Sequence, residues 1–256
     1  MSTLALAVRQ IRYENLAFWR NPAAAFFTFA FPLLFMVIFN VLFGGSSQDA
    51  PPGLSAADFF TPGIIAFSVI TATFTNMAMN ITFARDAGIL KRVRGTPLPP
   101  VAFLGGRIAH AALIALVLTV IVAAFGALLY DVAVPWGQLP VLIVVLVVGA
   151  ATFCALGLAL TGFIPNADAA PAIVNAAILP LLFISNVFIQ MNNAPEWLDT
   201  VSRIFPVRHF ADALMGIYSP ELSGVTFQWA DVGVVALWGV AGVLIALRTF
   251  SWEPRR

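Results

Sequence analysis

The functional groups of this chain are concentrated in one short segment, residues 84–98, which lies between two long apolar runs. Its charged residues are Arg85, Asp86, Lys91, Arg92 and Arg94. Lys91 is the sole lysine of the chain, and it lies between Leu90 and Arg92. A phosphate-binding loop instead needs a lysine that follows a glycine and precedes Ser or Thr. The segment therefore predicts a contact surface, and it does not predict a nucleotide site in this chain.

The same segment is expected to form a short helix. A helix from Asp86 to Arg94 places Ile89, Leu90 and Val93 on one side and the basic residues around the rest. We expect Asp86 at its start, where a negative charge favours the helix dipole, and Pro97 just beyond its end. Such a rigid helix can dock into a groove of a soluble partner. The alternative is that its charges only fix the topology and bind anionic lipid headgroups.

Composition excludes a water-soluble domain. The chain has 256 residues, of which 61% are hydrophobic and 10% charged, and its mean hydropathy is +0.94. Soluble domains carry roughly 25% charged residues. The single cysteine, Cys154, leaves no disulfide or multi-cysteine metal site within one chain. A length of about 20 residues per membrane crossing leaves room for about six crossings. We therefore expect an all-α polytopic membrane protein.

Long apolar runs separated by polar, Pro- or Gly-containing connections define the expected spans. They must be helical, because lipid offers the backbone no hydrogen-bonding partner. A helix within 1–22, apolar on one face and arginine-bearing on the other, precedes them and is expected to lie in the membrane interface. The expected membrane-spanning helices are 23–43, 59–83, 108–130, 139–164, 169–191 and 227–247.

The distribution of basic residues predicts the orientation. With the N-terminus inside, only Arg203 and Arg208 of the 13 basic residues fall on the outer side. Basic residues gather on the cytoplasmic side of membrane proteins. Both termini are therefore expected in the cytoplasm. The residues expected inside are Arg9, Arg12, Arg20, Arg85, Lys91, Arg92, Arg94, Arg107, Arg248, Arg255 and Arg256.

An amphipathic segment follows the fifth expected span, within residues 192–224. Residues 196–205 and 209–218 each read as a short helix, and Pro206 separates them. Neither piece has the roughly 20 residues that a crossing needs. We interpret them as an outer re-entrant helical hairpin; the alternative is an amphipathic loop that rests on the membrane surface.

A few polar or aromatic side chains inside the expected spans are candidates for lining a transport pathway. The alternative for each polar residue is a hydrogen bond between helices, worth about 0.6 kcal/mol in a membrane bundle. His110 is the ionisable residue closest to mid-depth and reads as interfacial, which weakens an ion-driven mechanism. The candidate lining residues are Phe35, Asn40, Asn76, Asn80, Asn175, Ser185 and Asn186.

The pattern of the charged segment resembles a known family. The string Arg85-Asp86-x-Gly88-x-Leu90-Lys91-Arg92-x-Arg94-Gly95-Thr96-Pro97-Leu98, directly after the second expected span, is similar to that of ABC-2-type exporter membrane subunits. These include drug-resistance permeases of actinobacteria and carriers of polysaccharide and teichoic acid precursors. The layout of spans and the stretch 205–214 extend the resemblance over essentially the whole chain, so residues 1–256 are expected to form a single transmembrane domain.

The resemblance implies a half-transporter. Two six-span permease subunits, identical or related, would form the pathway, and two copies of a separate ABC ATP-binding subunit would bind ATP and Mg. The loop 84–98 would carry the coupling helix that contacts this subunit, with 1–22 as a second cytoplasmic contact. The contact residues expected in the loop are Arg85, Asp86, Ile89, Leu90, Lys91, Arg92, Val93 and Arg94.

The sequence thus predicts a permease subunit of an ATP-driven exporter in a bacterial plasma membrane. Its cargo would be an apolar or amphipathic compound such as a drug, a lipid or a glycan-linked lipid. We expect no catalytic residue, cofactor or metal in the chain, and lipids but no nucleic acid as further partners. The alternatives are an ion-coupled secondary transporter and a membrane scaffold that transports nothing. Which cargo is carried stays open.

Overall fold

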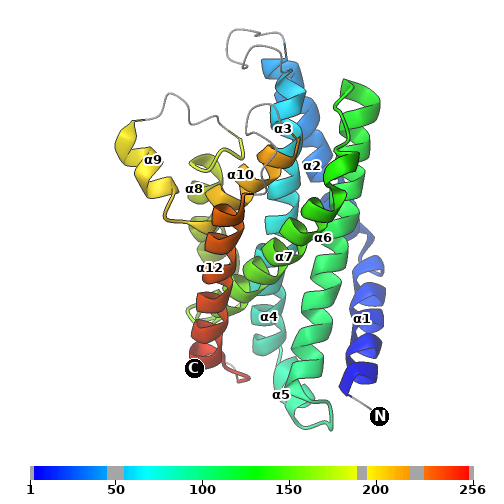
Figure 1. The fold of residues 1–256 in the computed structure, drawn as a ribbon. Coiled ribbons are helices and arrows are strands. Elements are labelled where there is room, and N and C mark those ends of the chain that lie inside the picture. The colour runs from blue at the N-terminus through cyan, green and yellow to red at the C-terminus, as the bar shows by residue number, and fades with distance from the viewer. Residues whose placement is uncertain (1–2, 45–54, 189–194, 219–227, 254–256) are drawn as a thin grey trace.

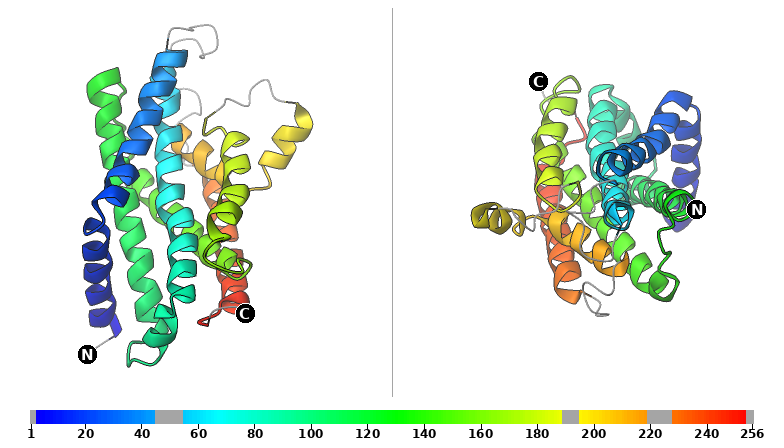
Figure 2. Two further views of the ribbon diagram at one scale, coloured as in Figure 1. Left: turned by 180° about the vertical axis from the view of Figure 1, so that it is seen from behind. Right: turned by 90° about the horizontal axis from the view of Figure 1, so that it is seen from above.

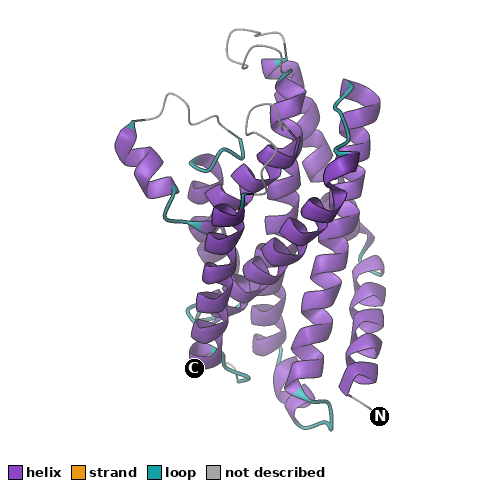
Figure 3. Cartoon of the chain, in the orientation of Figure 1, coloured by secondary structure: helices purple, strands orange, loops and turns teal. Residues whose placement is uncertain are grey.

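The computed structural model describes residues 3–44, 55–188, 195–218 and 228–253, and these residues form helices and connections without a strand (Figure 3). The expectation of an all-helical chain is confirmed. The longer helices are α1 (Thr3–Trp19), α2 (Pro22–Phe43), α3 (Ala56–Ile70), α4 (Asn76–Asp86), α6 (Pro100–Tyr130), α7 (Leu139–Thr161), α8 (Ala170–Phe183), α10 (Pro206–Tyr218) and α12 (Trp229–Thr249). The shorter elements are a π-helical segment (Thr71–Thr75), α5 (Ile89–Arg94), a 3-10 turn (Trp136–Gln138) and α9 (Glu196–Ser202).

Five helical stretches in the described ranges are long and apolar enough to cross a membrane. They are Pro22–Phe43, Ala56–Asp86, Pro100–Tyr130, Trp136–Thr161 and Trp229–Thr249. The remaining expected span, 169–191, contains α8, which has 14 residues. At 1.5 Å per residue it measures roughly 21 Å, less than a hydrocarbon core of roughly 30 Å. The expected count of six is therefore not confirmed. Residues 189–191 of this span lie outside the described ranges.

Two spans are longer than the sequence suggested. The second runs without a break from Ala56 to Asp86, because the π-helical segment joins α3 to α4. The third begins at Pro100, where a proline in the first helical turn needs no hydrogen-bond donor. Arg107 and His110 therefore lie within a continuous helix of 31 residues.

Helix α1 runs alongside the first half of α6 (Figures 1 and 2). Glu14 accepts a hydrogen bond from Arg107 Nε at 2.9 Å, and Gln10 packs against Gly106. Phe18 makes an edge-on ring contact with His110 further up the same pair of helices. The partners advance together along both chains, so the two helices are parallel. The expected position of residues 1–22 in a membrane interface is not confirmed.

The two ends of the bundle differ in what they carry. The start of α1, the end of α12 and α5 lie at one end, and α9, α10, the end of α2 and the start of α3 lie at the other (Figures 1 and 2). Helix α3 lies at the centre, and every residue from Phe60 to Ile70 is buried. Helix α10 packs into the bundle at the upper end, where Phe210 fits against Gly149 of α7. Residues 192–194 and 219–224 of the expected hairpin lie outside the described ranges.

Candidate functional site

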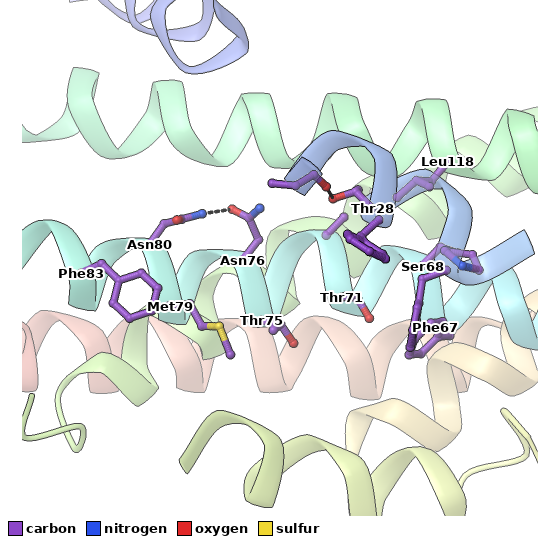
Figure 4. A pocket seen from close by; sticks show the side chains of 15 residues that line it. Thr28, Phe67, Ser68, Thr71, Thr75, Asn76, Met79, Asn80, Phe83 and Leu118 are labelled. Carbon is purple, nitrogen blue, oxygen red and sulfur yellow. Dashed lines mark hydrogen bonds between the residues drawn. The ribbon is translucent and has the colours of Figure 1, made fainter. Parts of the chain in front are cut away.

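A groove runs between α2, the α3–α4 span and α6, with a volume of about 330 Å³ (Figure 4). None of the 15 described residues that line it is ionisable. Its lining residues are Ala24, Phe27, Thr28, Phe31, Pro32, Phe67, Ser68, Thr71, Ala72, Thr75, Asn76, Met79, Asn80, Phe83 and Leu118. Such a lining excludes a strongly charged ligand, since an unpaired charge is costly away from water.

The polar groups of this groove follow one another along the α3–α4 span. Asn76 and Asn80 lie one turn apart and point to the same side of α4, where Asn80 Nδ2 donates to Asn76 Oδ1 at 2.8 Å (Figure 4). Together they offer one amide NH₂ group and one amide oxygen beyond this mutual bond. The site therefore suits an uncharged molecule that is apolar over most of its surface and carries a few hydrogen-bonding groups.

The π-helical segment shapes the middle of this groove. Thr71, its first residue, is exposed, whereas the next three residues are buried. Buried Thr73 and Ser68 donate to the carbonyls of Val69 and Ile64 in the preceding turn. Single π-helical turns inside α-helices frequently occur at functional sites. Residue spacing gave no signal for this segment, which lies in the middle of the expected span 59–83.

The other five candidate lining residues do not share the groove. Asn40 is buried and donates to the Met36 carbonyl one turn earlier at 2.9 Å, within its own helix. Phe35 belongs to an aromatic cluster and stacks on Phe39 and Phe188. The remaining three lie on or after α8: exposed Asn175, buried Ser185 and Asn186, whose amide donates to Asp212 at 2.8 Å.

Helix α5 presents its charged side at the end of the bundle that carries both termini. Leu90 is fully buried and packs into a cluster with Ile81, Phe103 and Cys154. Ile89, Lys91, Arg92 and Arg94 are exposed and Val93 is half-buried. The chain turns into this helix at Gly88, whose φ of 69° lies in the left-handed region that glycine adopts without strain.

Arg85 and Asp86 face inward and hold another part of the chain. Arg85 is 1% exposed and donates to the carbonyl oxygens of Thr161 at 2.9 Å and Ile164 at 2.8 Å. The carboxylate of Asp86 accepts a hydrogen bond from the backbone N–H of Ala167. These bonds tie the end of α4 to the connection between α7 and α8. We call this set of bonds the Arg85 clasp.

The position of Asp86 differs from the sequence expectation. We expected it at the start of the coupling helix, but it is the last residue of α4, and α5 begins only at Ile89. The left-handed turn at Gly88 separates the two helices. The exposed surface of α5 is thus formed by four of its residues, and Leu90 is buried beneath it.

Comparison with known proteins bears on what this arrangement does. The profile of the ABC-2 type transporter family matches residues 4–218. The chain belongs to the ABC-2 type transporter family. It is therefore a membrane permease, and permeases of this family normally pair with an ATP-binding subunit. The resemblance inferred from the segment 85–98 is confirmed.

The relatives of this ABC-2 permease are named for transport. It is 29% identical over 214 residues to the daunorubicin resistance ABC transporter permease protein DrrB1 of Streptomyces coeruleorubidus, covering 80% of this chain and 70% of that protein. It is 23% identical to the inner membrane transport permease YadH of Escherichia coli, covering 84% and 80%. It is 24% identical to the probable multidrug ABC transporter permease YbhR of E. coli, covering 67% and 46%.

Proposed function

We propose that this ABC-2 permease forms one half of the membrane pathway of an ATP-driven exporter. Two permease subunits assemble as a homodimer or with a related chain, and two copies of a separate ATP-binding subunit bind ATP and Mg. The observation that carries the proposal is α5, which exposes Lys91, Arg92 and Arg94 at the terminus-bearing end while Leu90 anchors it in the bundle. The positive-inside rule supports a cytoplasmic position for this end.

Helix α5 is the docking element, because its exposed residues combine one apolar side chain with three cations. Ile89 is 42% exposed, which suits a small apolar contact at the centre of an interface. A movement of α5 reaches the rest of the bundle through two sets of contacts. Leu90 transmits it to Ile81, Phe103 and Cys154, against which it packs. The Arg85 clasp transmits it from the end of α4 to the α7–α8 connection.

The groove beside Asn76 and Asn80 is the part of the pathway that holds cargo. Its uncharged lining supports the export of an apolar or amphipathic compound. Its volume of about 330 Å³ falls at the lower end of the roughly 300–1,000 Å³ of small-molecule sites. A drug, a lipid tail or the lipid part of a glycan carrier fits these terms equally well.

Charge reversal on α5 tests the docking step. In Lys91→Glu/Arg92→Glu both changes are exposed, so the permease is expected to insert and fold normally while co-purification of the ATP-binding subunit is lost. Ile89→Asp is expected to weaken the same contact through the apolar side chain. Leu90 is unsuitable for this test, because it is fully buried and an acid there would disrupt the bundle itself.

The matched control is Arg248→Glu, an exposed charge reversal in the last turn of α12 at the same end of the bundle. It is expected to leave co-purification unchanged. If the control and both α5 variants retained the ATP-binding subunit equally, the docking role of α5 would be wrong. Its basic residues would then serve only to fix the topology and bind lipid headgroups.

A further inference from the structure

A cluster of charged side chains lies at the opposite end of the bundle, where α9, α10 and α12 meet. Arg208 Nε donates to Asp212 at 2.7 Å, and its other nitrogens reach Asp199 at 3.4 Å and Ser202 at 3.3 Å. Arg203 pairs with Asp199 at 2.8 Å. Helices α9 and α10 are therefore joined by polar contacts.

His209 occupies an unusual position in this cluster, since both of its ring nitrogens face acceptors. Nδ1 lies against the carboxylate of Asp231 on α12, and Nε2 lies 2.8 Å from the carbonyl oxygen of Arg203. Neutral imidazole has one donor and one acceptor, and only imidazolium donates from both nitrogens. The observed arrangement therefore matches the protonated ring.

The charges around His209 agree with this reading. Asp199 and Asp212 pair with the guanidinium groups of Arg203 and Arg208, and the carboxylate of Asp231 lies against His209. A protonated His209 supplies the third positive charge and makes the cluster neutral. Tyr218, on the same helix, does not take part near neutral pH, because burial raises its pKa to about 12.

The contacts of His209 hold the C-terminal end of α9. Helix α9 projects from the bundle (Figures 1 and 2). The carbonyl oxygens that follow it are held by two side chains of the body: His209 binds that of Arg203, and Trp238 Nε1 donates to that of Ile204 at 2.9 Å. Phe205 stacks on the ring of Trp238 directly after them. Loss of the His209 bond leaves this end of α9 with fewer tethers.

The segment held in this way covers a second cavity. An apolar space of about 250 Å³ lies between α7, α8 and α12. The connection between α9 and α10 contributes Phe205, Pro206 and Val207 to its lining, and α12 contributes Trp238. The tethers of α9 and the wall of this cavity thus share Phe205 and Trp238.

We propose that His209 is a proton-binding site that latches the α9–α10 connection over this cavity. With the proton bound, His209 bridges Asp231 and the Arg203 carbonyl, and the connection stays seated. When the proton leaves, one of the two bonds is lost, the cluster carries a net negative charge, and α9 swings outward. Histidine side chains titrate between about pH 5 and 8, so acid closes the latch and alkali releases it.

A distance measurement on the permease alone in nanodiscs tests this latch. Spin labels are attached to cysteines introduced by Thr200→Cys on α9 and Leu128→Cys on α6, both exposed positions, in a Cys154→Ala background. At about pH 5 we expect one narrow distance, and at about pH 8 a shift to a longer and broader distribution. A pair at Leu128 and Val240, on α6 and α12, is expected to give the same distance at both pH values.

Two variants separate the latch from other effects of pH. His209→Gln cannot take up the proton and is expected to give the long distance at both pH values. Asp231→Asn removes the negatively charged acceptor that Nδ1 faces, so the narrow distance at about pH 5 is expected to broaden. The proposal would be overturned if the wild-type distance were the same at both pH values. It would also be overturned if both variants showed the same change of distance with pH as the wild type. Because the assay contains no ATP-binding subunit and no cargo, its outcome is independent of the proposed export function.

Discussion

The guanidinium of Arg85 at the end of α4 donates to the carbonyl oxygen of Thr161 at the end of α7, 76 residues further along the chain. The last carbonyls of a helix lack partners within the helix, and a buried one is costly when unpaired. Arg85 supplies that partner and binds Ile164 as well. A cation at this position also opposes the negative end of the α7 dipole. The clasp therefore fixes the connection after α7 against the end of α4, just before α5.

Loss of this side chain should destabilise the permease. In Arg85→Ala the carbonyls of Thr161 and Ile164 lose their donor and Asp86 loses its paired cation, at a cost on the order of 3 kcal/mol. We expect a clear fall in Tm, measured by thermal unfolding of the purified protein. Arg92→Ala, which removes an exposed arginine seven residues away, should change stability by no more than about 0.5 kcal/mol. Equal Tm values for the two variants would show that the clasp does not contribute to the stability of the permease.

The close packing of α7 on the π-helical segment gives a second prediction. A Cβ added at Gly157 would lie 2.6 Å from the backbone oxygen of Phe74, which cannot move without displacing the segment. Gly157→Ala should therefore cost about 1–3 kcal/mol in stability and lower the Tm. Gly105→Ala on α6 is the control, since a Cβ there meets no atom within 4 Å. It should be neutral or stabilising because alanine favours helix; an equal loss in both variants would contradict the packing argument.

Filling the groove should impair ligand binding. Asn76→Phe places a bulky ring beside Asn80 and removes an amide, and we expect at least about a tenfold weaker affinity, or ~1.4 kcal/mol, for an uncharged fluorescent amphipath. The measurement is equilibrium binding to the permease in nanodiscs. Asn175→Phe makes the same change at an exposed position of α8 outside the groove and should leave the affinity unaltered. An affinity that survives Asn76→Phe would place the ligand elsewhere.

Some of this architecture was readable from the sequence and some was not. The apolar runs predicted helical spans, because composition alone decides that a segment suits lipid. The burial of Arg85 was not predicted, because its partners are backbone carbonyls, and those leave no mark in the residue types. The short length of α8 was not predicted for a related reason. The apolar run continues past Phe183, but the helix ends there and the backbone turns at Asn186 with a φ of 56°.

The candidate sites divide in the same way. Asn76 and Asn80 were predicted to line the pathway, and their spacing of one helical turn brings them together in one groove. Asn40 has the same residue type, but its amide donates to the Met36 carbonyl one turn earlier in its own helix. The cluster around His209 joins residues from three helices, and only the packing of those helices brings them together. Residue type therefore identified candidate residues, but their hydrogen-bonding partners in the fold determine which of them line the groove.

The most direct test of the account is ATP turnover by the purified permease in nanodiscs, with and without its ATP-binding subunit. Lys91, the sole lysine, lies in α5 beside Arg92 and forms no phosphate-binding loop. We expect no nucleotide binding and no hydrolysis by the permease alone. With the ATP-binding subunit added, we expect hydrolysis that depends on Ile89, Lys91 and Arg92. ATP hydrolysis by the permease alone, or a subunit whose turnover is the same with and without the permease, would contradict the account.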